Sequence, residues 1–173
     1  TTSLPLELTP ELSELRERAR RFVDEVLIPR EREAERLHGR LPAEAIAEIK
    51  REGIAARLNG GLHSPEYGGQ GWSRMEWALV EEQFGRSTNA LSWHVPSAYN
   101  VLASGSDPQI ERYLKPALRG ELHDAYAVTE AAAGSDPSGI ETTAVRRDGG
   151  WVTVPAAGAC CPKRTGCNKG RMA

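Results

Sequence analysis

Apolar positions recur every three or four residues along the first part of the chain, which is the spacing of one face of a helix. The first such segment begins at Thr9, a suitable N-cap, with Pro10 in its first turn. Its apolar positions are Leu12, Leu15, Ala19, Phe22 and Val26. Pro29 lacks the N–H group that the helical ladder needs, so we expect a bend or interruption there.

Further helices follow in the same style. One is expected from near Pro42 toward Gly53. The pair Ser73 and Glu76 forms a capping box, and it precedes a helix whose predicted buried face is Trp77, Val80 and Phe84. Another helical stretch is expected over about 89–103, although Pro96 interrupts its pattern, and a helix restarts at 106–109 with a Ser cap and Gln three residues later.

The pattern changes from helical to alternating after Gly120. Residues 124–130 alternate like a strand, and the runs 142–145 and 151–154 flank Asp148-Gly149-Gly150, which predicts a β-hairpin. Helices first and strands afterwards indicate an α+β protein, with an N-terminal all-α helical domain followed by an incomplete antiparallel β domain. We predict a helical domain over 1–120 and the start of a β domain over 121–154.

Residues 155–173 form an irregular tail with no amphipathic period, which we interpret as unrelated to the fold. Our hypothesis is that the reading frame changes there, and a continuous, homogeneous coding sequence would refute it. All three cysteines lie in this tail, at positions 160, 161 and 167. Their spacing fits neither a zinc knuckle nor a thioredoxin-type pair, so we interpret them as free thiols.

Composition narrows the function classes. The 173 residues carry a net charge of only −2 and no basic stripe, which argues against a nucleic-acid partner. No apolar stretch approaches the length of a membrane span, so we expect a cytoplasmic enzyme or part of one, without a membrane partner. The four histidines are scattered, and no metal site or nucleophile elbow is predicted.

The stretch from Ala125 to Asp136 carries the strongest chemical signal. A half-apolar alternating run ends at Thr129-Glu130 and gives way to a loop of small residues closed by Gly134-Ser135-Asp136. Such a loop leaves backbone N–H groups free and lets a ligand approach them, while the Thr129 and Ser135 hydroxyls add neutral donors. Two interpretations are open. The loop could bind a phosphate or a polar heterocycle, or it could be a tight loop capped by its own side chains.

Three stretches resemble the acyl-CoA dehydrogenase family in order and spacing. Residues 126–136 resemble its Thr-Glu-Pro-x-Ala-Gly-Ser-Asp signature, although Ala131-Ala132 replace Pro-Gly. Residues 65–71 resemble its Pro-x-x-Tyr-Gly-Gly-x-Gly turn, and 109–116, closing at Gly120-Glu121, resemble the helix that leads into the flavin strand. The resemblance covers roughly residues 9–152. On residue pattern alone, the glycine-rich turn is interpreted as structural rather than as a phosphate cradle, because the strand and helix of a dinucleotide motif are missing around it.

The resemblance implies FAD as cofactor, an acyl-CoA substrate and an electron acceptor. In the family a base removes the α-proton of the thioester while the β-hydrogen leaves as hydride to flavin N5. The implied cofactor-binding residues are Tyr126, Val128, Thr129, Glu130, Ala133, Gly134 and Ser135, and Ser135 also reaches the acyl-CoA. By the same resemblance, the backbones of Tyr126 and Val128 contact the isoalloxazine, Thr129 contacts its pyrimidine side, and Gly134 and Ser135 lie near the phosphates. Candidates for the wall of the acyl pocket are Thr88, Leu91, Ser92 and Val95.

The family takes its catalytic carboxylate from a C-terminal helical domain that this sequence does not include, so no catalytic residue is assigned. We therefore expect the chain to be inactive alone, and we expect a homo-oligomer only for a full-length form. Alternatives stay open. Same-fold relatives act as flavin oxidases or monooxygenases, and the chain could instead be a non-catalytic helical fragment or a degraded gene product.

Overall fold

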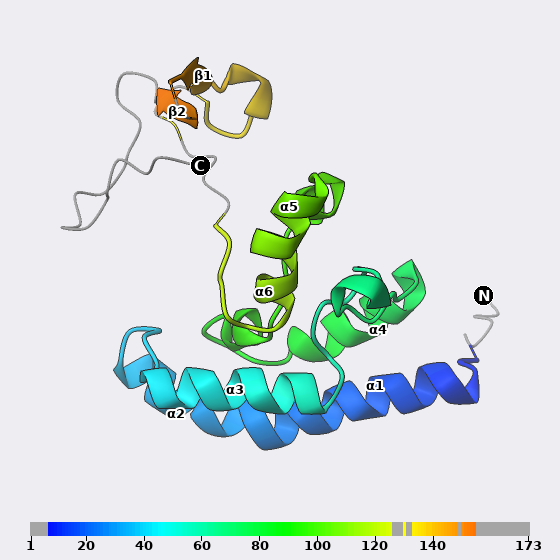
Figure 1. Ribbon diagram of the computed structural model, residues 1–173. Helices are drawn as coiled ribbons and strands as arrows, with labels where there is room; N and C mark the ends of the chain where they lie inside the picture. The colour runs from blue at the N-terminus through cyan, green and yellow to red at the C-terminus, as the bar shows by residue number, and fades with distance from the viewer. Residues whose placement is uncertain (1–6, 126–129, 131–132, 149, 155–173) are drawn as a thin grey trace, which may run out of the picture. The chain divides into compact units, whose positions relative to one another are not determined.

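The computed structural model describes residues 7–125, 130, 133–148 and 150–154. The chain divides into two compact units, Thr1–Asp124 and Ala125–Ala173, and each is described by itself (Figure 1). Helices make up the first unit, and the second contains an antiparallel two-stranded sheet. The predicted α+β class is confirmed, whereas the predicted tail lies outside the described residues.

The first helix, α1 (Pro10–Phe22), begins where the sequence predicted it. The Leu12 amide donates to the Thr9 hydroxyl at 3.3 Å, so Thr9 is the N-cap. The predicted apolar stripe is confirmed for Leu15, Ala19 and Phe22, which are buried. The cap and the stripe therefore fix both the start of α1 and the side that it turns to the core.

The α-helical hydrogen-bond pattern is interrupted after α1, as the presence of Pro29 in the sequence predicted. A π-helical turn (Val23–Leu27) and a 3₁₀ turn (Ile28–Arg30) separate α1 from α2 (Glu31–Arg36). Pro29 lies in the 3₁₀ turn, where its missing N–H leaves the carbonyl four residues earlier without its α-helical donor. The π turn before it absorbs the mismatch and still buries Val23 and Leu27.

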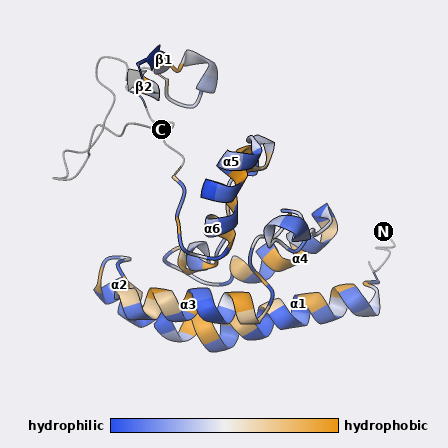
Figure 2. Ribbon diagram, viewed as in Figure 1, coloured by the Kyte–Doolittle hydropathy of each residue, from blue (hydrophilic) through white to orange (hydrophobic). Residues whose placement is uncertain are grey.

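Two further helices, α3 (Ala43–Ala55) and α4 (Arg74–Phe84), complete the main core. Apolar positions are interleaved with hydrophilic ones along α1, α3 and α4 (Figure 2). The helix α1 packs on α4, where the rings of Phe22 and Phe84 lie 6.1 Å apart, and α3 contacts the π turn. The largest fully buried side chains of this core cluster are Leu27, Ile49, Leu58, Leu91, Val23 and Val80.

The predicted capping box of α4 is confirmed. The Glu76 amide donates to the Ser73 hydroxyl at 3.3 Å, and the Ser73 amide donates to the Glu76 carboxylate at 2.8 Å. Val80 and Phe84 are buried as predicted, while Trp77 is partly buried against the same core. Two donors of the first turn are thereby satisfied reciprocally.

In the glycine-rich turn at residues 65–71, glycines pack directly against the backbone of the same segment. A 3₁₀ turn (Pro65–Tyr67) ends at Gly68, whose φ is +97°. A Cβ on Gly69 would lie 2.1 Å from the His63 carbonyl oxygen, and that same oxygen accepts from the Gly71 amide at 2.8 Å. The Asn59 side chain donates to the Gly68 carbonyl at 3.3 Å. These contacts support the structural interpretation of the turn.

The predicted helix over 89–103 is wrong. The structure has two 3₁₀ turns instead, Leu91–His94 and Asn100–Ser104. Pro96 lies between them, and Val95 before it is extended with ψ of 126°, as a residue before proline prefers. Proline's missing N–H and the extended residue before it therefore outweigh the helical spacing of the side chains.

The helix predicted from Ser106 forms in three parts, α5 (Asp107–Gln109), a π turn (Ile110–Leu114) and α6 (Lys115–Leu118). The capping box between Ser106 and Gln109 is present. Pro116 in the first turn of α6 again removes a donor from the ladder, which accounts for the wider turn before it. This segment buries a second apolar cluster of Ile110, Leu114 and Leu118.

The second unit contains a 3₁₀ turn (Pro137–Gly139) and the predicted hairpin of β1 (Thr143–Arg147) and β2 (Gly150–Val154). The strands pair antiparallel from Thr143 opposite Val154 to Arg147 opposite Gly150. The hairpin prediction is therefore confirmed. Among the described helices of the chain, none has the length and apolar character needed to cross a membrane.

Candidate functional site

The loop between residue 130 and β1 carries the described part of the predicted cofactor site. Glu130, Ala133, Gly134 and Ser135 are described, whereas Tyr126, Val128 and Thr129 lie outside the described residues. Glu130 and Ala133 are buried, and Gly134 and Ser135 are exposed. The loop therefore divides into residues that face the chain and residues that face solvent.

The exposed part of the loop presents unpartnered donors. No described residue accepts a hydrogen bond from the amide of Gly134 or Ser135, or bonds the Ser135 hydroxyl. Gly134 has a φ of +39°, and a Cβ built on it would meet no atom within 4 Å. Consecutive amide groups in a turn with a glycine can form a concave anion site, so this donor set fits a phosphate or a polar heterocycle.

The acidic side chains of the loop are used by the chain itself. Glu130 accepts from the Glu141 amide at 2.8 Å and from the Thr142 amide at 2.9 Å. Hydrogen bonding by the Thr142 side chain, and after it by the Glu141 amide, lowers the pKa of Glu130 below its ordinary value. Asp136 accepts from the Ser138 amide at 2.9 Å and from its hydroxyl at 2.6 Å, and these bonds lower the pKa of Asp136 in the same way. Both carboxylates are thus engaged by the chain next to the free donors.

The four candidates for the acyl pocket wall do not share one environment. Leu91 and Val95 are buried in the main core of the helical unit. Ser92 is half-buried, and Thr88 is exposed with its amide donating to the Glu31 carboxylate at 2.7 Å. Packing accounts for Leu91 and Val95, and the acyl-wall role stays a prediction.

The four histidines of the described region differ in exposure, since His63 is buried, His94 is half-buried, and His38 and His123 are exposed. His63 is 5% exposed, and its Nε2 lies 2.7 Å from the Ala98 carbonyl oxygen. Burial, then the nearby charges of His123 and Lys50, lowers the pKa of His94. Within the described residues, no group of three His, Cys, Asp or Glu side chains could hold a metal ion.

A polar groove between α1 and α4 is a feature that the sequence did not indicate. It has a volume of about 240 Å³ and is lined by Arg16, Glu17, Arg20, Gln83 and Arg86. The sequence pattern predicts only that charged residues of α1 face solvent. Gln83 lies in α4 and Arg86 lies just after it, far along the chain from the three lining residues of α1. No local sequence signal could therefore have placed these two side chains beside α1.

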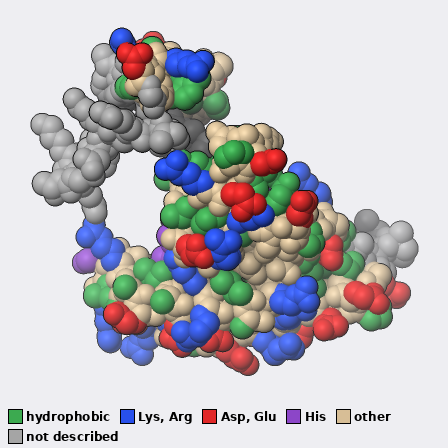
Figure 3. Space-filling view, in the orientation of Figure 1, with side chains coloured by type: hydrophobic (Ala, Val, Ile, Leu, Met, Phe, Trp, Pro, Cys, Tyr) green, Lys and Arg blue, Asp and Glu red, His purple; other side chains and the backbone are tan. Residues whose placement is uncertain are grey.

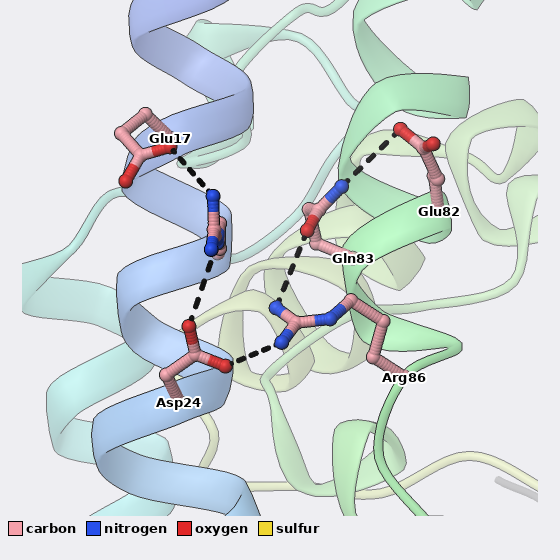
Figure 4. Close-up of polar contacts among 6 residues, drawn as sticks. Glu17, Asp24, Glu82, Gln83 and Arg86 are labelled. Carbon is pink, nitrogen blue, oxygen red and sulfur yellow. Dashed lines mark hydrogen bonds and ion pairs between the residues drawn. The ribbon is translucent and has the colours of Figure 1, made fainter.

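The charges in this groove are largely paired with one another (Figure 4). Arg86 donates to Asp24 at 2.6 Å and to the Gln83 oxygen at 3.4 Å. Arg20 lies 3.6 Å from Asp24 and 3.8 Å from Glu17. Side chains of both signs are also interspersed over the visible face of the helical unit (Figure 3). Glu17, Arg20 and Arg86 are therefore engaged by the chain, and the contact between Arg86 and Asp24 joins the chain just after α4 to the π turn that follows α1.

A helical unit followed along the chain by an antiparallel hairpin, with exposed donors on the loop before the hairpin, defines the fold class as α+β. A family model described as acyl-CoA dehydrogenase, N-terminal domain, matches residues 9–121. The chain belongs to the acyl-CoA dehydrogenase family, which confirms the resemblance. The family consists of FAD-dependent oxidoreductases.

Similar proteins include reductases as well as dehydrogenases. The chain is 31% identical over 146 residues to a 3-(aryl)acrylate reductase of Clostridium sporogenes, covering 81% of this chain and 37% of the relative. It is 32% identical over 137 residues to the caffeyl-CoA reductase-Etf complex subunit CarC of Acetobacterium woodii, covering 76% of this chain and 35% of the relative. The chain thus spans little more than a third of the length of these relatives.

Solved structures agree in fold. A probable acyl-CoA dehydrogenase from Mycobacterium abscessus is 33% identical with a TM-score of 0.70, covering 84% of this chain and 39% of that one. The structure of PigA with FAD and proline is 26% identical with the same TM-score of 0.70, covering 87% of this chain and 40% of that one. The similarity to both structures extends over most of this chain.

Proposed function

We propose that this chain supplies the N-terminal helical part, and one side of the flavin site, of an FAD-dependent oxidoreductase acting on the Cα–Cβ bond of an acyl-CoA thioester. The observation that carries this proposal is the loop at Gly134 and Ser135, which presents unpartnered donors within the family signature. Family membership supports the cofactor, and the acyl-CoA names of several relatives support the substrate class.

The chain's own contribution to this chemistry is binding and orientation. FAD, when bound, accepts or donates the hydride. The amides of Gly134 and Ser135 would hold its phosphates, and the Ser135 hydroxyl would be shared with the acyl-CoA. By the family resemblance, Tyr126, Val128 and Thr129 would contact the ring system.

The direction of the reaction and the electron partner are also part of the proposal. A saturated acyl-CoA loses two hydrogens in the oxidation, and an α,β-unsaturated acyl-CoA gains them in the reduction. The relative from Acetobacterium woodii is named as a subunit of a complex with Etf, which supports an electron-transferring flavoprotein as the partner. We expect electrons to pass between the flavin and such a partner in either direction.

The test is the absorbance spectrum of the purified chain after incubation with excess FAD and desalting. We expect a retained flavin band near one FAD per chain. Ser135→Ala removes one hydroxyl donor and should lower the retained fraction, whereas Ser97→Ala, at an exposed position of the helical unit, should not. Absence of retained flavin in the unsubstituted chain would refute the proposal that these residues hold FAD by themselves.

One observation favours a second substrate class. PigA, which has the same fold similarity, is described with FAD and proline rather than with a CoA thioester. Quenching of the bound flavin's fluorescence by an acyl-CoA, but not by free amino acids, would support the first class. The reverse result would support the second.

A further inference from the structure

The Glu130 side chain joins two places that are distant along the chain. Its Oε2 accepts from the amide of Glu141 and its Oε1 accepts from the amide of Thr142, which lie eleven and twelve residues further on. Each carboxylate oxygen therefore bonds one of two consecutive amides. Those amides directly precede β1, which begins at Thr143.

The Glu130 side chain that makes this contact is buried. Glu130 is 8% exposed, although the residues around β1 are mostly exposed. A buried carboxylate has to be compensated by hydrogen bonds, and charge-assisted bonds to amides are among the stronger ones that a protein makes. The arrangement is thus specific for an ionised carboxylate, because a neutral amide side chain would present an NH₂ group to one of the two N–H groups.

The residues with free donors lie between the two ends of this connection. Gly134 and Ser135 fall inside the segment that Glu130 closes, and Asp136 next to them is bound by Ser138. Closing a segment at its ends reduces the number of conformations open to it. The Glu130 carboxylate therefore restrains the part of the loop that presents donors outward, while its own oxygens point to the chain.

We propose that Glu130 is a positioning residue of the flavin loop, which fixes the loop ends through the amides of Glu141 and Thr142 and acts on the cofactor without touching it. This inference rests on the proposed function, since it assumes that the loop holds FAD. It assigns the acidic residue of the signature to the support of the site, and the binding contacts to Gly134 and Ser135.

The experiment compares Glu130→Gln with a matched control, Glu141→Gln. Both changes remove one negative charge from the same loop, but the Glu141 side chain is exposed and only its backbone amide bonds Glu130. Two quantities are measured on the full chain. NMR gives the hydrogen-exchange rates of the amides of Glu141 and Thr142, and fluorescence gives the dissociation constant for FAD. Unchanged resonances of the helical unit show that each variant is folded.

We expect Glu130→Gln to speed the exchange of at least one of these amides by tenfold or more and to weaken FAD binding by about tenfold, the scale of one lost hydrogen bond to a charged group. Glu141→Gln should leave both quantities near the unsubstituted values. Glu130→Asp keeps the charge but shortens the side chain, so its two losses should be intermediate and proportional to each other.

The other possible results separate the positioning role of Glu130 from the proposed function. Weaker FAD binding with unchanged amide exchange would show that Glu130 touches the cofactor and would overturn the positioning role. Faster exchange with unchanged FAD binding would overturn it as well, because the restraint would not matter to the ligand. Were the unsubstituted chain to bind no FAD, the proposed function would fail, while amide exchange would still decide whether Glu130 holds the loop.

Discussion

Two neighbouring glycines in the turn after His63 should respond very differently to the same change. In Gly69→Ala the new Cβ would lie 2.1 Å from the His63 carbonyl oxygen and 2.6 Å from its carbonyl carbon. In Gly68→Ala the new Cβ would meet nothing within 4 Å, but it would sit on a residue with φ of +97°. The first substitution therefore tests steric exclusion and the second tests backbone strain alone.

The geometry sets the expected order of magnitude. Moving the His63 oxygen from 2.1 Å to an ordinary contact at 3.4 Å requires a displacement of about 1.3 Å of backbone, which cannot rotate aside. That oxygen also accepts the Gly71 amide at 2.8 Å. Overpacking costs about 1–3 kcal/mol and a lost hydrogen bond about 1 kcal/mol, so we expect Gly69→Ala to cost about 2–4 kcal/mol. A non-glycine residue in a left-handed conformation costs about 1–2 kcal/mol, which is the expectation for Gly68→Ala.

The assay is urea and thermal unfolding of the full chain, followed by far-UV circular dichroism. At this chain length 1 kcal/mol corresponds to roughly 2–4 °C, so the melting temperature should fall by roughly 4–16 °C in Gly69→Ala and less in Gly68→Ala. Equal losses in the two variants, or a larger loss in Gly68→Ala, would refute the steric argument. In that case the close approach to His63 would not be the reason that this turn requires glycine.

Three further predictions concern the helical unit. Ile49→Ala empties a fully buried position and should cost about 2–5 kcal/mol in urea unfolding, whereas Ile54→Ala, at a position 39% exposed, should cost under about 1 kcal/mol. Ser73→Ala should cost about 1 kcal/mol. The Ser73 hydroxyl, and after it the Ser73 amide, lowers the pKa of Glu76 below its ordinary value, and only the hydroxyl is removed by the substitution. The stabilisation from the hydroxyl is present above the ordinary carboxyl pKa and is lost as pH falls through the lowered one. Unfolding at pH 6 and pH 3.5 should therefore differ less in Ser73→Ala than in the unsubstituted chain. Asp24→Asn breaks an ion pair whose side chains are 39% exposed, so it should change stability by under about 1 kcal/mol and less still in high salt.

Features with a local cause could be predicted from the sequence. Thr9, Ser73 and Ser106 cap helices because each places an oxygen over amides only a few residues away. The hairpin followed in the same way from two alternating runs around a glycine turn. In both cases the interaction that decides the structure spans only a few residues.

Features decided by competition or by distance could not be predicted. The expected helix over 89–103 failed because side-chain spacing does not include the backbone donor that Pro96 lacks. The π turns at 23–27 and 110–114 depend on how a proline-interrupted ladder is re-formed while its apolar residues stay buried. Within the candidate site, the bonds that the amides of residues 141 and 142 donate to Glu130 had no sequence signal, because they depend on how the loop returns to the chain.

The loop also explains why a match to a signature does not by itself assign ligand contacts. Residues that hold the loop, Glu130 and Asp136, flank the residues that present donors outward, Gly134 and Ser135. The two groups occur in one motif because a donor is useful only when the backbone that carries it is fixed. Ala131-Ala132 stand where the signature that the sequence resembles has Pro-Gly, and an alanine in place of proline makes a chain less stiff. The restraint that proline would have added near the loop's start is then left to the Glu130 carboxylate, so this chain should depend on that side chain more than a relative with the proline does.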